Sequence, residues 1–271
     1  MAWRNLKCWV VAATAALILS GASAQARTLN EILSAGEIRV GVNPNYPPAT
    51  QYNDKNELVG FEIDIAQKLA EMLGVKISFV TVDPNSRIPF VTTNKIDYVM
   101  GGMTRTPDRA KLIDFTVPIN TEGFAVLTTE GQPYKNIAEM NNPNVTFVEV
   151  RGTTPVPYIQ ENLKDAKLLL LDDWPDAFRS LADGRATAII ADQAFFGDWM
   201  SKFGNVKWKI LKGTFGPVYY DCLGVAQGND SLRHWLNVAL FNLQSSGFID
   251  ASWKRWYKIE MANPVMPQPY F

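Results

Sequence analysis

The sequence contains little cysteine and histidine, and no excess of charge of either sign. Its 271 residues include two cysteines and one histidine. Lys plus Arg number 26 and Asp plus Glu number 27, so no basic surplus exists to neutralise nucleic-acid phosphates or an anionic membrane surface. We therefore expect no nucleic-acid partner. The hydrophobic share of 47% is typical of a globular chain, and the length suggests two compact units.

The first residues have the order of a secretory signal peptide. Arg4 and Lys7 precede an uncharged run from Cys8 to Ser20, and small residues follow. The A-x-A rule places cleavage after Ala24 or Ala26, so we assign residues 1–26 to a signal peptide and expect a periplasmic protein. The run is shorter than the roughly 20 residues of a membrane span, and an N-terminal anchor helix is the alternative interpretation.

The remaining chain lacks the usual signatures of redox, metal and nucleotide chemistry. It keeps one cysteine, Cys222, which excludes an intramolecular disulfide, and the aliphatic neighbours of that residue favour an inert buried thiol. His234 lies in an amphipathic helical pattern, where a surface role is more common than metal binding. No CxxC, GxGxxG, P-loop or GxSxG string occurs. We expect no cofactor and no metal ion.

The order of local patterns predicts an α/β protein. Strands are predicted at 37–42, 76–82 and 96–100, with helices at 61–73 and 87–93 between them. The same alternation returns with strands at 145–150, 167–171 and 188–191 and helices at 154–163 and 174–183. An extended segment at 219–226 and two helical patterns, from Leu232 to Leu243 and around Trp253, end the chain. This order predicts two α/β units with largely parallel sheets, which bind ligands at the carboxyl edges of their strands.

Several segments resemble the polar amino-acid substrate-binding proteins of ABC importers, the family 3 extracellular solute-binding proteins. The most specific are the T-P-x-R-x-x-x-x-D-F-x-x-P string at 106–118 and the G-F-x-x-D-[IL]-A helix start at 60–66. Further similar segments are IRVGVNPNYPP at 38–48, VRGTT at 150–154 and GFIDASWKRWY at 247–257.

The resemblance implies the two-lobe fold of type II periplasmic binding proteins, with the ligand cleft between the lobes. Two crossover strands would form the hinge, so the first lobe is discontinuous. Residues 28–122 and 222–271 would form lobe one, and residues 123–221 lobe two. The local patterns alone do not assign the C-terminal helices to the first lobe.

The resemblance also implies how the cleft binds a free amino acid. Arg109 matches the arginine that binds the α-carboxylate, a task suited to its planar guanidinium. Asp192 matches the acid that receives the α-ammonium. Further donors to the carboxylate would be the backbone of Gly102, the hydroxyl of Thr104 and the backbone N–H groups of Thr153 and Thr154. Taken singly, Arg109 fits a surface arginine, Thr154 a plain N-cap and Asp192 a cap for the helix near Gln193.

Two residues bear on the side chain of the ligand. Tyr46 matches an aromatic residue that stacks against the ligand, and an exposed loop tyrosine is the alternative. Arg87 stands in a small polar stretch that resembles relatives selective for acidic amino acids. It would meet a side-chain carboxylate unless Asp83 or Asp114 pairs with it, and Arg105 and Arg151 are further cations near strand ends. We therefore expect glutamate or aspartate, with a neutral polar amino acid as the alternative.

The expected function is a monomeric periplasmic receptor that delivers its ligand to the membrane permease of an ABC importer. An enzyme of the cyclohexadienyl dehydratase type is the competing interpretation, because such enzymes resemble the same family and use the same cleft. The sequence shows no cleft histidine and no clear spare acid for proton transfer, which speaks against an enzyme. A sensor module would need signalling segments that this chain lacks.

Overall fold

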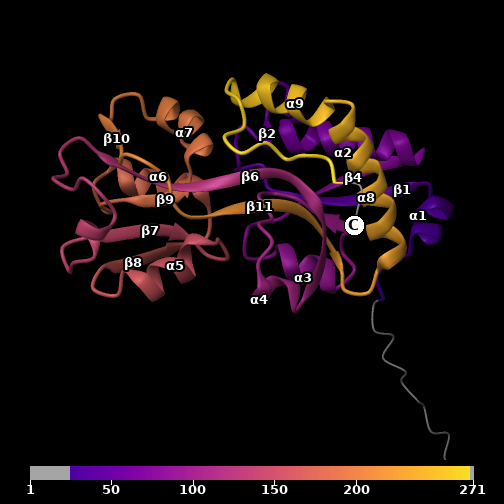
Figure 1. Ribbon diagram of the computed structural model, residues 1–271, viewed down its shortest axis with the longest axis horizontal. Coiled ribbons are helices and arrows are strands. Elements are labelled where there is room, and N and C mark those ends of the chain that lie inside the picture. The colour runs from indigo at the N-terminus through magenta and orange to yellow at the C-terminus, as the bar shows by residue number, and fades with distance from the viewer. Residues whose placement is uncertain (1–24, 269–271) are drawn as a thin grey trace, which may run out of the picture.

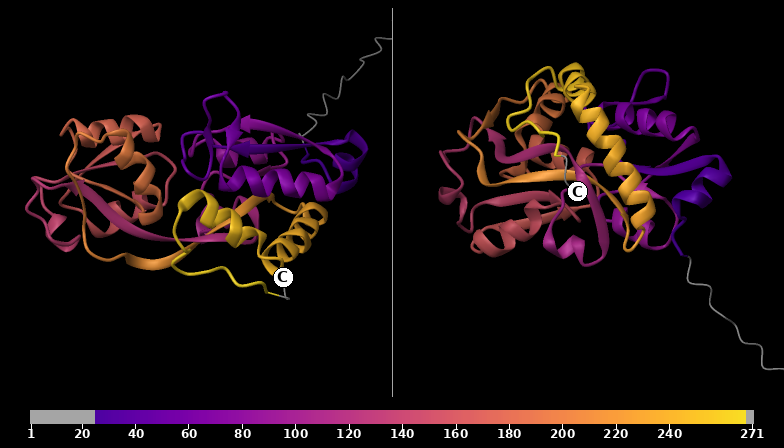
Figure 2. Two further views of the ribbon diagram at one scale, coloured as in Figure 1. Left: turned by 90° about the horizontal axis from the view of Figure 1, so that it is seen from above. Right: turned by 45° about the vertical axis from the view of Figure 1, so that its right-hand side comes forward.

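Two long antiparallel strands, β6 (Ile113–Thr129) and β11 (Phe215–Ala226), run side by side through the middle of the molecule and connect two α/β lobes (Figure 1). The computed structural model describes residues 25–268, so nearly all of the predicted signal peptide lies outside the described residues. Among the described residues, no helix is long and apolar enough to cross a membrane. Seen from above, β6 and β11 bridge the space between the lobes (Figure 2).

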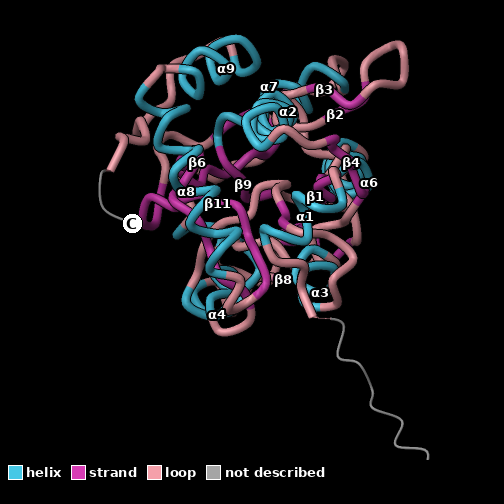
Figure 3. The backbone as a smooth tube through the Cα atoms, turned by 90° about the vertical axis from the view of Figure 1, so that its right-hand side faces the viewer, coloured by secondary structure: helices cyan, strands magenta, loops and turns pink. Residues whose placement is uncertain are grey.

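The first lobe is built on three parallel strands, in which β1 (Glu37–Val42) lies between β4 (Lys76–Thr81) and β5 (Tyr98–Val99). Strand β5 pairs with the far end of β11, which joins this sheet to the strands that cross between the lobes. Viewed from the end of this lobe, helices surround the strands (Figure 3). The helices and the small hairpin that precede β6 are α1 (Leu29–Ala35), β2 (Gln51–Tyr52), β3 (Leu58–Val59), α2 (Phe61–Leu73), α3 (Arg87–Thr92) and α4 (Pro107–Ala110).

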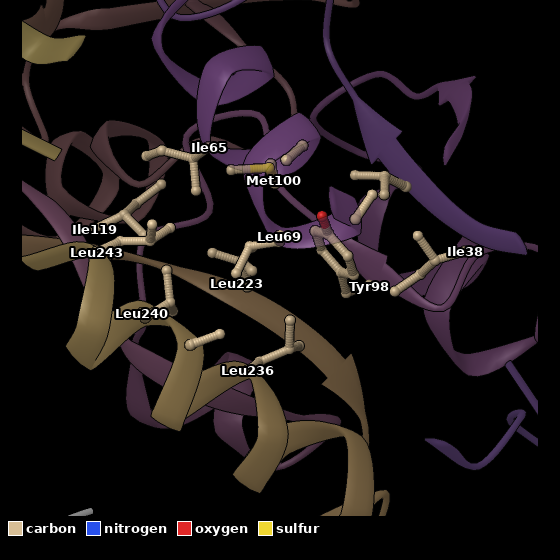
Figure 4. Close-up of a cluster of buried hydrophobic side chains, with 14 of the residues drawn as sticks. Ile38, Ile65, Leu69, Tyr98, Met100, Ile119, Leu223, Leu236, Leu240 and Leu243 are labelled. Carbon is tan, nitrogen blue, oxygen red and sulfur yellow. The ribbon is translucent and has the colours of Figure 1, made fainter. Parts of the chain in front are cut away.

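The last two helices, α8 (Asp230–Ser245) and α9 (Phe248–Tyr257), return to the first lobe. Leu236 and Leu240 of α8 are fully buried in one cluster with Ile65 and Leu69 of α2 and with Tyr98 of β5 (Figure 4). Burial of such side chains contributes about 1.5–3 kcal/mol each. The core of the first lobe is therefore made of segments from both ends of the chain.

The second lobe has its own core and its own strands. Strands β7 (Thr146–Val150) and β8 (Lys167–Leu171) pair in parallel, whereas β9 (Ile189–Asp192) and β10 (Trp208–Ile210) pair antiparallel with β6. The helices of this lobe are α5 (Pro155–Asn162), α6 (Trp174–Ala182) and α7 (Phe196–Lys202), and short 3₁₀ turns lie at Ala138–Met140 and Gln193–Phe195.

The predicted elements occur in the predicted order, and the sheet differs from the prediction. Strand β1 and helix α2 begin and end at the predicted residues. Gly74, with φ +73°, ends the helix as expected of a left-handed cap. The main sheet is mixed rather than largely parallel, since β6 and β11 are antiparallel to each other and β11 is antiparallel to β5. Crossing the molecule twice requires two strands of opposite direction, which local sequence patterns do not reveal.

Candidate functional site

A small cavity lies between the two lobes, beside the crossing strands. Its volume is about 30 Å³, which suffices for only a few water molecules. Both lobes contribute to its wall, and so do strand β6 and the carboxyl end of strand β9. The lining residues are Tyr46, Pro84, Arg87, Gly101, Gly102, Thr104, Arg109, Glu122, Phe124, Thr153, Thr154, Pro155, Trp174, Ala191 and Asp192.

All eight residues predicted for ligand binding line this cavity. The two further cations considered in the sequence do not, because Arg105 lies over the ring of Tyr220 at 5.1 Å and Arg151 forms an exposed ion pair with Asp172 at 3.0 Å. The fold therefore brings the eight predicted residues, which come from distant segments of the chain, to one cavity. Their role in binding a ligand stays a prediction.

Arg109 extends from the short helix α4 across the cleft. Thr106 caps this helix, accepting from the backbone N–H of Arg109 at 3.3 Å, and Pro107 occupies its first turn. The guanidinium donates to the carbonyl of Thr104 at 2.6 Å and to the carbonyl of Gly152 in the second lobe at 2.8 Å. Burial lowers the pKa of Arg109, but an arginine remains charged at neutral pH. Arg109 is therefore not the surface arginine of the alternative interpretation.

Arg87 is buried, with 2% of its surface exposed, and backbone carbonyls surround its guanidinium. Nε donates to Pro84 at 3.0 Å, and Nη1 donates to Gly101 and Gly102 at 2.6 Å each. Nη2 donates to Gly152 at 3.1 Å, so both arginines meet at one carbonyl oxygen of the second lobe. Burial, followed by repulsion from Arg109, lowers the pKa of Arg87 to about 9. Within residues 25–268, Arg87 forms no ion pair, with Asp83 and Asp114 or with any other acid.

The loop at Gly101 and Gly102 is held by a buried carboxyl of helix α2. Glu62 accepts from the backbone N–H groups of both glycines at 2.9 Å and from the hydroxyl of Thr50 at 2.9 Å. The N–H of Gly102, expected to donate to the ligand, therefore donates to Glu62. No local pattern indicated that α2 approaches this loop, so this hydrogen bond was not predicted.

Two threonines contact each other across the cleft. Thr154 stands at the N-cap position of α5, but its side chain makes no capping bond, and Oγ1 donates to Thr104 Oγ1 at 3.0 Å. Thr104 Oγ1 in turn donates to Glu122 Oε1 at 2.5 Å. The hydroxyl and the backbone N–H of Thr153 both donate to the carbonyl of Val150, at 2.7 and 3.2 Å. The donors predicted at Thr104 and Thr153 are thus engaged within the protein.

Asp192 ends strand β9 at the cavity wall and also caps the following turn. Its Oδ1 accepts from the backbone N–H of Gly123 at 3.4 Å and of Ala194 at 3.3 Å. The capping role of the alternative interpretation is therefore present together with the position on the cavity. Burial raises the pKa of Asp192 to about 7, because few donors compensate the loss of water around the carboxylate.

Aromatic rings from both lobes form another side of the site. The ring of Tyr46 lies 4.6 Å from that of Phe195 and 6.4 Å from that of Trp174, measured between centroids. Tyr46 is partly buried, so it differs from the exposed loop tyrosine of the alternative interpretation. Trp174 was missed as a lining residue, although its place after the strand at 167–171 could have indicated it.

Glu122 is the most important lining residue that the sequence did not indicate. It lies within the crossing strand β6 and is 7% exposed. The expectation that the cleft holds no spare acid is therefore wrong. A glutamate inside an otherwise apolar or neutral strand segment was the available signal. Cys222, by contrast, is buried and free as expected, and no cluster of metal-binding side chains occurs in the described part of the chain.

Comparison with known proteins places the chain among bacterial receptors. The sequence profile of bacterial extracellular solute-binding proteins, family 3, matches residues 38–259. The chain belongs to this family. ABC transporter arginine-binding protein 1 of Escherichia coli is 30% identical over 254 residues, which cover 93% of this chain and 99% of that protein.

Solved structures confirm the predicted fold. The crystal structure of an ancestral amino-acid-binding protein, described as a precursor of cyclohexadienyl dehydratase, matches with a TM-score of 0.78 and 30% identity. The match covers 84% of this chain and 99% of that one. The two-lobe, type II periplasmic-binding-protein fold is thus the fold of this chain.

The relatives differ in the ligand or activity that their names give. Besides arginine, the names include L-cystine, glutamine and glutamate/aspartate. One relative is an enzyme, the cyclohexadienyl dehydratase of Pseudomonas aeruginosa, which is 29% identical over 190 residues and matches 69% of each chain. The comparisons support an amino-acid-binding receptor of an ABC transporter and leave the amino acid open.

Proposed function

We propose that this chain is a periplasmic, non-enzymatic receptor that binds a polar amino acid between its lobes and delivers it to the permease of an ABC importer. The observation that carries the proposal is that a cation, Arg109, and an acid, Asp192, line the same cavity. An α-amino acid presents a carboxylate and an ammonium on one carbon, and a buried cleft must supply both opposite charges.

The proposed binding includes a movement of the lobes. A cavity of about 30 Å³ does not accommodate an amino acid, so entry requires the lobes to separate. We propose that lobe one comprises residues 28–122 and 222–271, and lobe two residues 123–221. The cross-cleft bonds from Arg109 to Gly152 and from Thr154 to Thr104 would then form on closure. A ligand that contacts both lobes favours the closed state by its differential affinity.

Two classes of side chain compete for the remainder of the site. Glutamate or aspartate is supported by Arg87, which adds a second cation to the cavity wall. A neutral polar amino acid is supported by the same residue's four bonds to carbonyls and by Glu122, which adds a second acid. The acidic ligand stays a prediction.

A dehydratase is the second candidate function, and Glu122 is the observation that favours it. Burial, followed by the charges of Asp221 and Asp192, holds the pKa of this carboxyl well above its ordinary value, as a general acid requires. Incubation of the purified protein with prephenate and arogenate tests this candidate. Formation of product that Glu122→Gln abolishes would establish an enzyme and contradict the receptor proposal.

The receptor proposal is tested by a thermal-shift panel of the twenty amino acids, followed by calorimetry with the best ligand. Arg109→Ala and Asp192→Ala should each weaken binding more than a hundredfold, because removing one partner of a buried charge pair costs about 3–5 kcal/mol. Arg151→Ala removes an exposed cation outside the cavity and serves as the control. Wild-type affinity in either cavity variant would exclude that residue from the site.

A further inference from the structure

The position of Glu122 in strand β6 places a second carboxyl beside the one assigned to the ligand's ammonium. Side chains two residues apart in a strand share one face, so Glu122 and Phe124 point the same way, and both line the cavity. Phe124 is the register partner of Asp192 in β9. Glu122 therefore lies beside Phe124 along β6, and Asp192 lies across from Phe124 in β9, so both acids are near the same part of the cavity.

The hydrogen bonds of Glu122 within residues 25–268 engage Oε1 and leave Oε2 free to accept another hydrogen bond. Thr104 Oγ1 donates to Oε1 at 2.5 Å, and Thr154 Oγ1 donates to Thr104 Oγ1 at 3.0 Å. A hydroxyl has one hydrogen, so Thr104 offers only lone pairs to anything else in the cleft. No described residue donates to Oε2 of Glu122. Unlike the guanidinium of Arg87, this carboxyl has one oxygen that only a ligand or water can satisfy.

The acidic side chains near Glu122 disfavour binding of a ligand carboxylate at this part of the cavity. Glu122 and Asp192 line the cavity, and Asp221, which accepts from Asn120 at 2.9 Å, is buried in the adjacent strand β11. Burial and the charges of Asp221 and Asp192 raise the pKa of Glu122 well above its ordinary value, and Arg109 opposes that shift only weakly. A donor placed near Oε2 would favour the ionised form of Glu122 and lower this pKa, whereas a ligand carboxylate there would raise it further.

We propose that Glu122 determines specificity by accepting a hydrogen bond from the ligand side chain. The site then favours amino acids whose side chain ends in an N–H or O–H donor over those with a second carboxylate. The inference rests on the proposed receptor function and names the substrate class of the same cleft. Glutamine and glutamate differ at one terminal group, so this pair isolates the effect.

The experiment is calorimetry of wild type and Glu122→Gln with two matched pairs, glutamine against glutamate and asparagine against aspartate. Wild type should prefer the amide in whichever pair binds by up to about tenfold, the range of one ordinary hydrogen bond, because the raised pKa of Glu122 offsets part of the gain from its charge. Glu122→Gln supplies an amide donor in place of a carboxyl oxygen, so it should remove that preference. Glu122→Asp retains a carboxyl and should keep the direction of the preference.

Glu149→Gln is the matched control, because Glu149 is also a fully buried strand carboxyl but lies outside the cavity lining. It should leave the ranking of ligands unchanged. A wild-type preference for the acid would overturn the inference even if Glu122→Gln failed to fold, and so would an unchanged ranking in a folded Glu122→Gln. If no amino acid binds wild type at all, the receptor proposal itself fails, which is a separate outcome.

Discussion

Replacing Gly152 with alanine should disfavour closure of the lobes. Gly152 has φ +80°, and a Cβ there would lie 2.8 Å from the Cα of Asn85 and 2.9 Å from the carbonyl oxygen of Pro84. Both neighbours are backbone atoms of the first lobe, so they cannot rotate away as a side chain could. The carbonyl of Gly152 also accepts from Arg109 at 2.8 Å and from Arg87 at 3.1 Å.

The free-energy cost of Gly152→Ala has two parts, and only one of them depends on closure of the lobes. The left-handed backbone costs a non-glycine residue about 1–2 kcal/mol whether the lobes are open or closed. The clash exists only when Gly152 meets Asn85 and Pro84. If it removes one of the two bonds from an arginine to the Gly152 carbonyl, the closed state loses about 1.5–3 kcal/mol. Ligand affinity should then fall by roughly ten- to a hundredfold.

Calorimetry and small-angle scattering measure the two consequences. Gly152→Ala should bind the ligand more weakly and show a smaller decrease in radius of gyration at saturation than wild type. Gly184→Ala is the control, because Gly184 has φ +72° and a Cβ there meets no atom within 4 Å. It carries the same backbone cost without the contact. If Gly152→Ala bound ligand and contracted as wild type does, the assignment of this contact to closure would be wrong.

The remaining predictions concern proton linkage and the core. Burial raises the pKa of Asp192 to about 7 from an ordinary 3.8, so the native state binds an extra proton between these values and this group's contribution to stability decreases as pH rises through that window. An ammonium requires the ionised form, so affinity should fall about tenfold from pH 8 to pH 6, with proton release visible by calorimetry in two buffers of different ionisation enthalpy. Equal affinity at both pH values would contradict this role. Leu240→Ala in α8 should reduce the free energy of unfolding by about 2–5 kcal/mol in urea titrations, since Leu240 is fully buried against α2. A loss below 1 kcal/mol would argue against α8 as part of that core.

Helices and strands with a clear apolar spacing and a clear end signal were predicted well from the local sequence. Helix α2 could be predicted from its apolar spacing and from Gly74 at its end, and β8 from a short run of leucines bounded by polar residues. Short or irregular elements such as α4 and the β2–β3 hairpin were not predicted. Strand β6 is hard to recognise locally, because its polar residues Asn120, Thr121 and Glu122 interrupt the apolar pattern at the point where the strand passes between the lobes.

The residues that line the candidate site were predicted more accurately than the hydrogen bonds that these residues form. Arg109 and Asp192 follow recognisable strings, and the carboxyl edge of a strand is where such side chains gather. The donors expected from Gly102 and Thr104 are instead engaged by Glu62 and Glu122. Those partners come from a helix 40 positions earlier in the chain and from the crossing strand 18 positions later, so no local pattern could indicate them.

The shared carbonyl of Gly152 suggests why an anion should favour the closed lobes. Arg87 and Arg109 both donate to this one oxygen, and the charge of Arg109 contributes to the lowered pKa of Arg87, so the two cations repel each other there. A carbonyl offers only a dipole to offset that repulsion, whereas a carboxylate offers a full negative charge. An α-carboxylate held near both guanidinium groups would therefore stabilise closure more than the Gly152 carbonyl alone. Glu122 and Asp192 line the same cavity, so under the proposed function the α-carboxylate would meet the two arginines while the α-ammonium and any side-chain donor would meet these two acids.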